Sequence, residues 1–261
     1  QKSPLADKAE VGWAPDVDEI ERRKRFALEL GGRESVARQH ASGRMTARER
    51  VAYLAEPNSF QEIGMLAGAA KYDDSGEALT VTPSNVVIGK CKIGGRNAVL
   101  SADDFTVRGG SSESSIAEKW QHAERLALNY QMPLVRLVDT AGGSIKQLEK
   151  AQSTKVPGYP YWPQAEMLGV IPVVGVALGP CAGFGAVRVV TSHLSIMVAN
   201  TSQVFAAGPD VVGPGLGEWV TKEELGGSKT HARASGVVDN EAATEKDAFD
   251  QVKRFLSYLP S

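Results

Sequence analysis

Short apolar runs alternate with helix-like segments in the second half of the chain. Residues 134–138 and 170–178 are rich in Val and Leu, and each run is short enough for a buried strand. Between residues 116 and 130 the apolar side chains recur every three or four positions, which predicts a helix with one buried face. The same patterns predict strands at 194–198 and 203–205, a short helix at 164–169 and another helix beginning near Gly183. This alternation indicates an α/β fold with parallel strands.

The first half of the chain predicts two helices followed by short β segments. Residues 1–18 are polar and contain two prolines, so we expect an irregular arm there. A helix is predicted over 19–30, where two glycines end it, and a second over 46–55, which opens with the capping-box pattern Thr-x-x-Glu. A last helix is predicted over 244–258. Short β segments are predicted at 60–63, 81–82, 85–88, 91–93, 98–101 and 105–107.

Composition excludes several classes of function. The chain has 261 residues, of which 42% are hydrophobic, so residues 1–261 can form one domain with a sizeable core. Its net charge of -2 gives no basic field for nucleic acid, and no run of about 18 apolar residues predicts a membrane span. Cys91 and Cys181 form no CxxC pair, so neither a zinc site nor a redox-active dithiol is expected. Few cysteines and no signal peptide favour a cytoplasmic location.

Three clusters of glycine follow predicted strands. They occupy residues 105–111, 138–144 and 178–186. In open α/β proteins ligands bind at the carboxyl ends of strands, and glycine there lets the backbone approach a ligand closely. A helix that starts at such a turn adds unpaired N–H donors for a phosphate or an oxyanion. The alternative is that these glycines only form tight turns.

Familiar catalytic and nucleotide-binding patterns are missing from the sequence. None of the clusters contains GxGxxG, and no GxxxxGK[ST] segment occurs, so the nucleotide-binding interpretations are disfavoured. No His/Asp/Ser or Cys/His arrangement is evident. We interpret Cys181 as a small buried residue and Asp139 as a residue that organises its own loop. His122, His193 and His231 are interpreted as structural.

Several motifs in order resemble those of the carboxyltransferase β subunits of propionyl-CoA and acetyl-CoA carboxylases. Residues 43–51 (GRMTARERV) resemble GKLTARERI of that family, and residues 104–111 resemble DFTVxGGS. Residues 139–145 are similar to DSGGARI, although the arginine is absent here. Later segments repeat GPCAG at 179–183 and GPDVV at 208–212, and residues 225–236 resemble LGGxxxHxxxSGV. The resemblance covers most of the chain and corresponds to the N-terminal half of the family proteins.

The resemblance implies a fold, an activity and a set of site residues. It implies a crotonase-like α/β fold (a ββα superhelix) and a carboxyltransferase that moves CO2 from N-carboxybiotin to the α-carbon of an acyl-CoA. The backbone N–H groups of Gly183 and Phe184 would form the oxyanion hole, although Phe184 stands where the family has glycine. Acyl-CoA would be bound by Gly109, Gly110, Ser111, Gly142, Gly143, Ala182 and Gly185.

The resemblance also implies partners. Biotin would be carried by a partner protein, and the expected partners are a C-terminal carboxyltransferase half or subunit, a biotin carboxyl carrier and a biotin carboxylase, in a hetero- or homo-oligomer. Three alternatives remain open on the sequence. One is a biotin-dependent acyl-CoA decarboxylase. The second is another crotonase-like hydratase, isomerase or thioester hydrolase. The third is a non-catalytic assembly subunit, which the departure at Phe184 favours.

Overall fold

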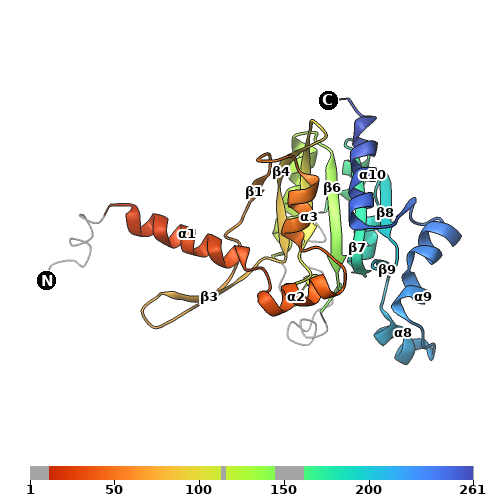
Figure 1. The fold of residues 1–261 in the computed structure, drawn as a ribbon, viewed down its shortest axis with the longest axis horizontal. Helices are drawn as coiled ribbons and strands as arrows, with labels where there is room; N and C mark the ends of the chain where they lie inside the picture. Colours follow the sequence, from red (N-terminus) through yellow and green to blue (C-terminus); the bar gives the residue numbers. More distant parts are fainter. Residues whose placement is uncertain (1–11, 113–115, 145–161, 261) are drawn as a thin grey trace.

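A mixed β-sheet forms the centre of the protein. The computed structural model describes residues 12–112, 116–144 and 162–260. The strands lie in the order β1-β4-β5-β6-β7-β8-β10, and β9 pairs with β7 (Figure 1). These strands are β1 (Gln61–Ile63), β4 (Val86–Ile93), β5 (Arg96–Asp103), β6 (Leu134–Thr140), β7 (Val173–Ala182), β8 (Leu194–Val198), β9 (Gln203–Phe205) and β10 (Asn240–Ala242).

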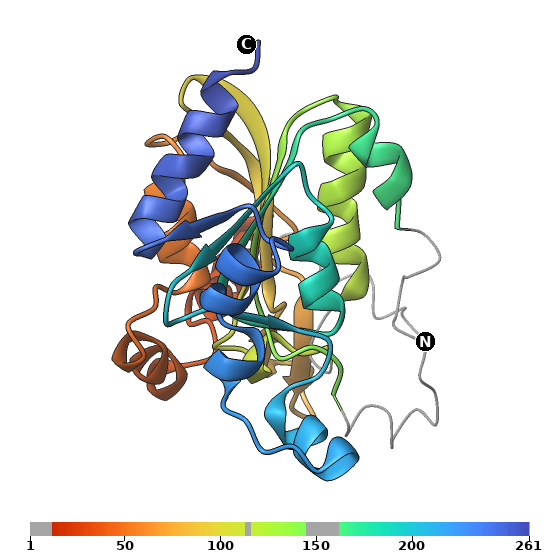
Figure 2. The ribbon, with the colours of Figure 1, turned by 90° about the vertical axis from the view of Figure 1, so that its right-hand side faces the viewer.

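Helices cover both faces of this sheet. On one face α3 and α10 share a core with the sheet, and on the other α4, α6 and α7 do so. Figure 2 shows α10 in blue and α4 in yellow-green on opposite sides of the strands. The helices are α1 (Ala14–Leu28), α2 (Arg33–Ala41), α3 (Ala47–Leu54), α4 (Ala117–Asn129), α6 (Gln164–Leu168), α7 (Phe184–Val190), α8 (Pro209–Leu216), α9 (Lys222–Gly226) and α10 (Glu245–Ser257).

The parallel α/β core predicted from the alternation is confirmed. Strands β5, β6, β7 and β8 are parallel neighbours, whereas β1, β4 and β5 pair antiparallel. Every residue of β6 is buried, as expected of a strand covered by helices on both faces. The predicted C-terminal helix is also confirmed, since α10 buries Phe249, Val252 and Leu256 against the sheet.

Strand β7 has two partners on one side. Its residues 174–177 pair with β8, and its residues 180–182 pair with β9. On its other side, the register with β6 shifts between Val138 and Thr140. Asp139 therefore lies at an irregularity in the sheet, beside the point where β7 passes from one partner to the next.

The predicted N-terminal arm is too long. Helix α1 begins at Ala14, within the expected irregular segment 1–18, and residues 1–11 of that prediction lie outside the described part. Pro15 does not mark irregular chain, since it occupies the first turn of α1, where its missing N–H is not needed. The prediction of a helix at 46–55 is confirmed, and both hydrogen bonds of the capping box between Thr46 and Glu49 are present.

The β segment predicted at 105–107 is wrong. The chain turns there and enters a short 3-10 helix, Arg108–Gly110, in which all three residues have positive φ angles of 50 to 66°. This left-handed backbone, which glycine adopts at little cost, takes the chain out of the sheet and into the first glycine cluster.

Helix α2 was not predicted, because its polar sequence has little apolar periodicity. A separate hairpin of β2 (Gly68–Tyr72) and β3 (Ala78–Pro83) lies beside α1 in Figure 1. Among the described residues, no helix is long and apolar enough to cross a membrane.

Lys119 of α4 is expected to make stability depend on pH. The residue is 6% exposed, and burial lowers the pKa of Lys119 to about 8, with Arg48 adding to the effect and Glu62 opposing it. Lys119→Met is expected to raise the free energy of unfolding at pH 7 by on the order of 3 kcal/mol, since one pKa unit corresponds to about 1.4 kcal/mol.

The increase in the free energy of unfolding that Lys119→Met causes should shrink as the pH rises from 8 towards 10.5, the ordinary pKa of lysine. Below pH 8 the folded protein holds a charged, buried Lys119, whereas above it the folded protein releases a proton that the unfolded chain retains. Urea unfolding of both proteins at pH 7 and pH 9.5 measures the difference. A difference of the same size at both pH values would contradict this explanation.

Candidate active site

The three glycine clusters meet around one cavity. Its volume is about 270 Å³, and it opens at the carboxyl ends of β5, β6 and β7. The lining residues are Asn85, Val86, Asp103, Gly110, Ser112, Trp120, Thr140, Gly142, Gly143, Gly183, Phe184, Gly185 and Arg188. Segments that are about 30 to 70 residues apart in the sequence thus form one wall, as expected for strand ends of a parallel sheet.

Thr140 connects the first cluster to the second. Its hydroxyl donates to the carbonyl of Gly110 at 2.7 Å and accepts from the N–H of Gly142 at 3.0 Å. The carbonyl of Gly142 in turn accepts from the N–H of Ser112 at 3.0 Å. Gly142 has a φ of 81°, and a Cβ there would crowd the backbone of Ala182, so this position requires glycine. These hydrogen bonds fix the two turns relative to each other.

The third cluster forms the transition from β7 to α7. Gly183 is the N-cap of α7 with a φ of 57°, and Phe184 and Gly185 are the first helical residues. A Cβ on Gly185 would overlap the Cγ2 methyl of Thr140, so glycine lets the start of α7 lie against the end of β6. The N–H groups of the first helical turn point away from the helix and have no acceptor within it.

One of the two predicted oxyanion donors, the N–H of Gly183, already has an acceptor in the structure. The N–H of Gly183 donates to the carbonyl of Phe205 at 3.0 Å, because the pairing of β7 with β9 continues by one amide beyond Ala182. That donor is therefore occupied. The positive φ of Gly183 also excludes proline at this position, so a Gly183→Pro variant would disturb the turn as well as remove an N–H.

The structure brings six of the nine predicted site residues to the cavity. These are Gly110, Gly142, Gly143, Gly183, Phe184 and Gly185. Gly109 borders a different, larger hollow beside α2. Ser111 is buried, and its carbonyl accepts from the side chain of Asn85 at 2.8 Å. Ala182 contributes backbone that packs against Gly142 but does not line the cavity.

The side walls of the cavity consist of residues that were not predicted. Trp120 and Phe184 face each other with ring centroids 5.4 Å apart and form an apolar wall. Arg188 and Asp103 form a buried ion pair at 3.0 Å on another wall. Burial raises the pKa of Asp103, although Arg188 opposes this effect. A charged residue within the apolar helix sequence AVRVV was the one available signal for Arg188.

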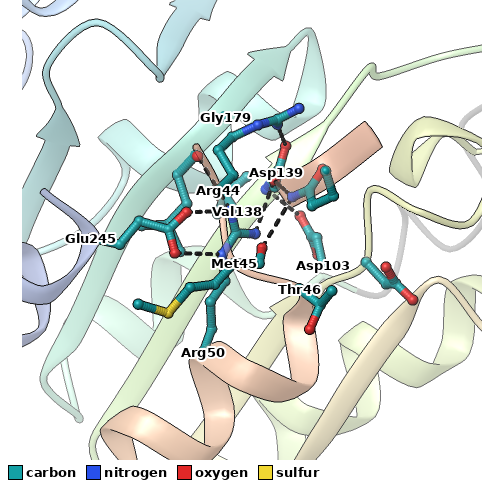
Figure 3. Close-up of polar contacts among 12 residues, drawn as sticks. Arg44, Met45, Thr46, Arg50, Asp103, Val138, Asp139, Gly179 and Glu245 are labelled. Atoms are coloured by element: carbon teal, nitrogen blue, oxygen red, sulfur yellow. Dashed lines mark hydrogen bonds and ion pairs between the residues drawn. The ribbon is translucent and has the colours of Figure 1, made fainter. Parts of the chain in front are cut away.

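Asp139 supports the site from below. Its carboxylate accepts from Arg44 at 2.8 Å, from Arg50 at 2.9 Å and from Gln39 at 3.1 Å, and Arg50 also binds Glu245 (Figure 3). The prediction that Asp139 organises its own loop is corrected, because the partners of its carboxylate lie on α2, on α3 and between them. These contacts join α2, α3, β6 and α10 directly beneath the strand ends that carry the second and third glycine clusters.

Cys181 is a buried structural residue, as predicted. Its thiol donates to the carbonyls of Val138 and Gly179, and burial raises the pKa of the Cys181 thiol well above its ordinary value. A thiol in this state is a poor nucleophile. The Nδ1 atom of His193 accepts from the N–H of Val173, and its Nε2 atom donates to the carbonyl of Leu168. No group of three His, Cys, Asp or Glu side chains that could hold a metal is found in the described ranges.

Comparison with known proteins gives the family. The carboxyl transferase domain family matches residues 38–261. The chain is 35% identical over 244 residues to the carboxyltransferase subunit of propionyl-CoA carboxylase from Haloferax mediterranei, covering 94% of this chain and 47% of that protein. It is 37% identical over 233 residues to methylmalonyl-CoA decarboxylase subunit alpha from Veillonella parvula, covering 88% of this chain and 45% of that protein.

Solved structures agree with these relatives. The transcarboxylase 12S structure with methylmalonyl-coenzyme A and methylmalonic acid bound superposes with a TM-score of 0.82 at 29% identity, over 95% of this chain and 48% of that one. The β subunit of geranyl-CoA carboxylase from P. aeruginosa, at 23% identity, shares the fold with a TM-score of 0.78, over all of this chain and 49% of that one. The crotonase-like α/β fold is thereby confirmed, and the chain spans about half the length of the relatives it matches. The chain belongs to the carboxyl transferase domain family.

Proposed function

We propose that the protein is the acyl-CoA-binding part of a biotin-dependent acyl-CoA carboxyltransferase. The observation that carries the proposal is the convergence of three glycine turns and an aromatic wall on one cavity at the carboxyl ends of β5, β6 and β7. A thioester entering this cavity would meet backbone amides on one side and the rings of Trp120 and Phe184 on the other. Membership of the carboxyl transferase domain family supports the same activity.

The amides at the start of α7 are proposed to stabilise an enolate. Removal of the α-proton from an acyl-CoA leaves negative charge on the thioester oxygen, and fixed donors that face this charge lower the barrier. We assign this role to the N–H groups of Phe184 and Gly185, which begin α7 and line the cavity. The N–H of Gly183 is bound to the carbonyl of Phe205. Loss of one such donor typically costs about 2.7–4 kcal/mol of transition-state stabilisation. A backbone donor tolerates the phenyl side chain at 184, which instead adds to the apolar wall.

The remaining chemistry belongs to a partner. Biotin on a carrier protein would supply the activated CO2, and the resemblance implies that its ureido group is also the base. The lining of the cavity is consistent with a base supplied by a partner. Among the described residues that line it, Asp103 is the one carboxylate, and Asp103 is already paired with Arg188. A hydratase or isomerase needs a positioned acid or base at the thioester, so that alternative is disfavoured.

The proposed assembly contains a second carboxyltransferase half. The relatives are about twice as long as this chain, so we infer that a C-terminal half, on the same or another polypeptide, docks against it. A biotin carboxyl carrier and a biotin carboxylase would complete the enzyme. An oligomer is expected, since the similar transcarboxylase 12S structure is described as a hexamer.

A second candidate runs the same site in the opposite direction. Identity to a methylmalonyl-CoA decarboxylase subunit is 37%, compared with 35% to a propionyl-CoA carboxylase subunit. The two reactions pass through the same enolate, so the geometry of α7 and the glycine turns serves both. The surroundings of the carrier, which are not part of this chain, would decide the direction.

The function is tested by binding and by transfer. Calorimetric titration of the protein with propionyl-CoA and with free CoA is expected to show that the thioester binds. The complete complex is expected to transfer labelled carboxylate from N-carboxybiotin to an acyl-CoA. Failure of every acyl-CoA to bind the assembled complex would overturn the proposal and favour a non-catalytic assembly subunit. Binding with transfer only from methylmalonyl-CoA to biotin would identify a decarboxylase.

A further inference from the structure

Arg188 is a buried cation in the wall of the proposed acyl-binding cavity. It is 5% exposed and lies on α7, four residues after Phe184, between the apolar residues Val187 and Val189. Its Nη1 atom donates to both carboxylate oxygens of Asp103 at 3.0 Å. The ring of Trp120 lies 5.4 Å from its guanidinium carbon. One side of the guanidinium is therefore fixed by Asp103.

The opposite edge of this guanidinium has no partner. Across residues 12–112, 116–144 and 162–260, no acceptor lies within hydrogen-bonding distance of Nε or Nη2, and both atoms are buried. A buried donor without an acceptor is costly and rare, so such groups in a binding cavity indicate that a ligand supplies the acceptor.

Three other arginines of this protein show what the edge formed by Nε and Nη2 binds. Arg50 is fully buried and donates from Nη1 to Asp139, as Arg188 does to Asp103. The Nε and Nη2 atoms of Arg50 bind the two carboxylate oxygens of Glu245 at 3.1 and 2.7 Å. Arg233 uses the same edge for the carboxylate of Glu241. Arg136, which is also fully buried, donates from the same two atoms to Glu124 and to the side-chain oxygen of Gln164. Both fully buried arginines thus have acceptors along this edge, whereas Arg188 has none there.

We propose that the Nε and Nη2 atoms of Arg188 bind a carboxylate at the far end of the substrate's acyl chain. This assignment rests on the function proposed above and narrows its substrate class to CoA monothioesters of short dicarboxylic acids. The carboxylate in question is distinct from the one that is transferred at the α-carbon. Two parallel N–H donors match the two oxygens of a carboxylate and leave an uncharged methyl terminus unpaired.

The position of Arg188 on α7 sets the expected length of the acyl chain. Four residues of α-helix rise about 6 Å, so Arg188 lies one turn beyond the amides that are proposed to face the thioester oxygen. An acyl chain of four or five carbons spans a comparable distance. Its methylene groups would pack on the rings of Trp120 and Phe184, which form the apolar wall between the two sites.

Matched thioesters test the assignment in the unmodified protein. Succinyl-CoA and butyryl-CoA differ only in whether the four-carbon chain ends in a carboxylate or a methyl group, and glutaryl-CoA and valeryl-CoA repeat the comparison with one more carbon. Calorimetric titration is expected to give at least tenfold tighter binding of the carboxylate member in one of the two pairs. Equal binding within each pair would overturn the role of Arg188 and leave the proposed function standing. Failure of all four thioesters and of free CoA to bind would overturn both.

The variant Arg188→Lys tests whether the preference comes from this side chain. Lysine keeps a positive charge for Asp103 but lacks the planar pair of donors. The carboxylate thioester is expected to bind less than threefold more tightly than the methyl-terminated one, and the urea unfolding midpoint of the variant reports whether the fold is intact. A preference that persists in Arg188→Lys would overturn the assignment.

Discussion

Gly185→Ala is expected to lower the kcat/KM of carboxyl transfer by about 10²-fold while leaving the protein folded. The added methyl group overlaps the Cγ2 of Thr140, so the start of α7 must move away from the end of β6. That movement displaces the amides proposed to face the thioester oxygen. A displacement of about 1 Å at a catalytic group can reduce a rate by about 10²-fold. The loss is measured as transfer of labelled carboxylate by the complete complex.

Thr140→Ser provides the matched control. Serine keeps the hydroxyl that bonds Gly110 and Gly142 but removes the methyl group that collides with residue 185. The double variant Thr140→Ser/Gly185→Ala is expected to recover most of the lost activity. A single Gly185→Ala variant with full activity would show that the start of α7 does not position the reacting thioester. A double variant as slow as the single one would attribute the loss to something other than this contact.

Local sequence patterns were sufficient to predict the main strands and helices that position the cavity. The apolar run of β6 and the helical spacing in α10 predict buried elements because burial on two faces or on one face directly produces these patterns. The glycine clusters correctly predicted turns at the strand ends, because glycine readily adopts the positive φ angles found at Gly110, Gly142 and Gly183. Their convergence on one cavity follows from the parallel pairing of β5, β6 and β7.

Contacts between distant segments account for what the sequence did not predict. The N–H of Gly183 is occupied because β9, some 20 residues later in the chain, pairs with the end of β7. The Asp103–Arg188 pair joins residues 85 positions apart, and no local pattern announces it. In the same way, the turn at 105–107 has the composition of a strand, but the left-handed residues that follow it remove it from the sheet.

Arg50→Met is expected to reduce the free energy of unfolding by about 3–5 kcal/mol, which is the typical cost of removing one partner of a buried ion pair. Arg50 is fully buried between Asp139 and Glu245. Burial lowers the pKa of Arg50, but attraction to both carboxylates outweighs this effect, so the pKa of Arg50 lies above its ordinary range. Without the guanidinium, Glu245 keeps a buried charge that no other ion pair of the described chain offsets, whereas Asp139 still accepts from Arg44 and Gln39.

Two further variants distinguish the effect of losing the buried ion pair from the effect of losing an arginine side chain. Arg233→Met removes the same type of Nε and Nη2 contact, to Glu241, at an exposed position and is expected to leave the urea midpoint nearly unchanged. Arg50→Met/Glu245→Gln removes the stranded charge and is expected to recover part of the loss. If Arg50→Met shifted the midpoint no more than Arg233→Met, the buried network could not be what holds α3 and α10 to the strand ends. The glycine turns above Asp139 would then owe their geometry to the sheet alone.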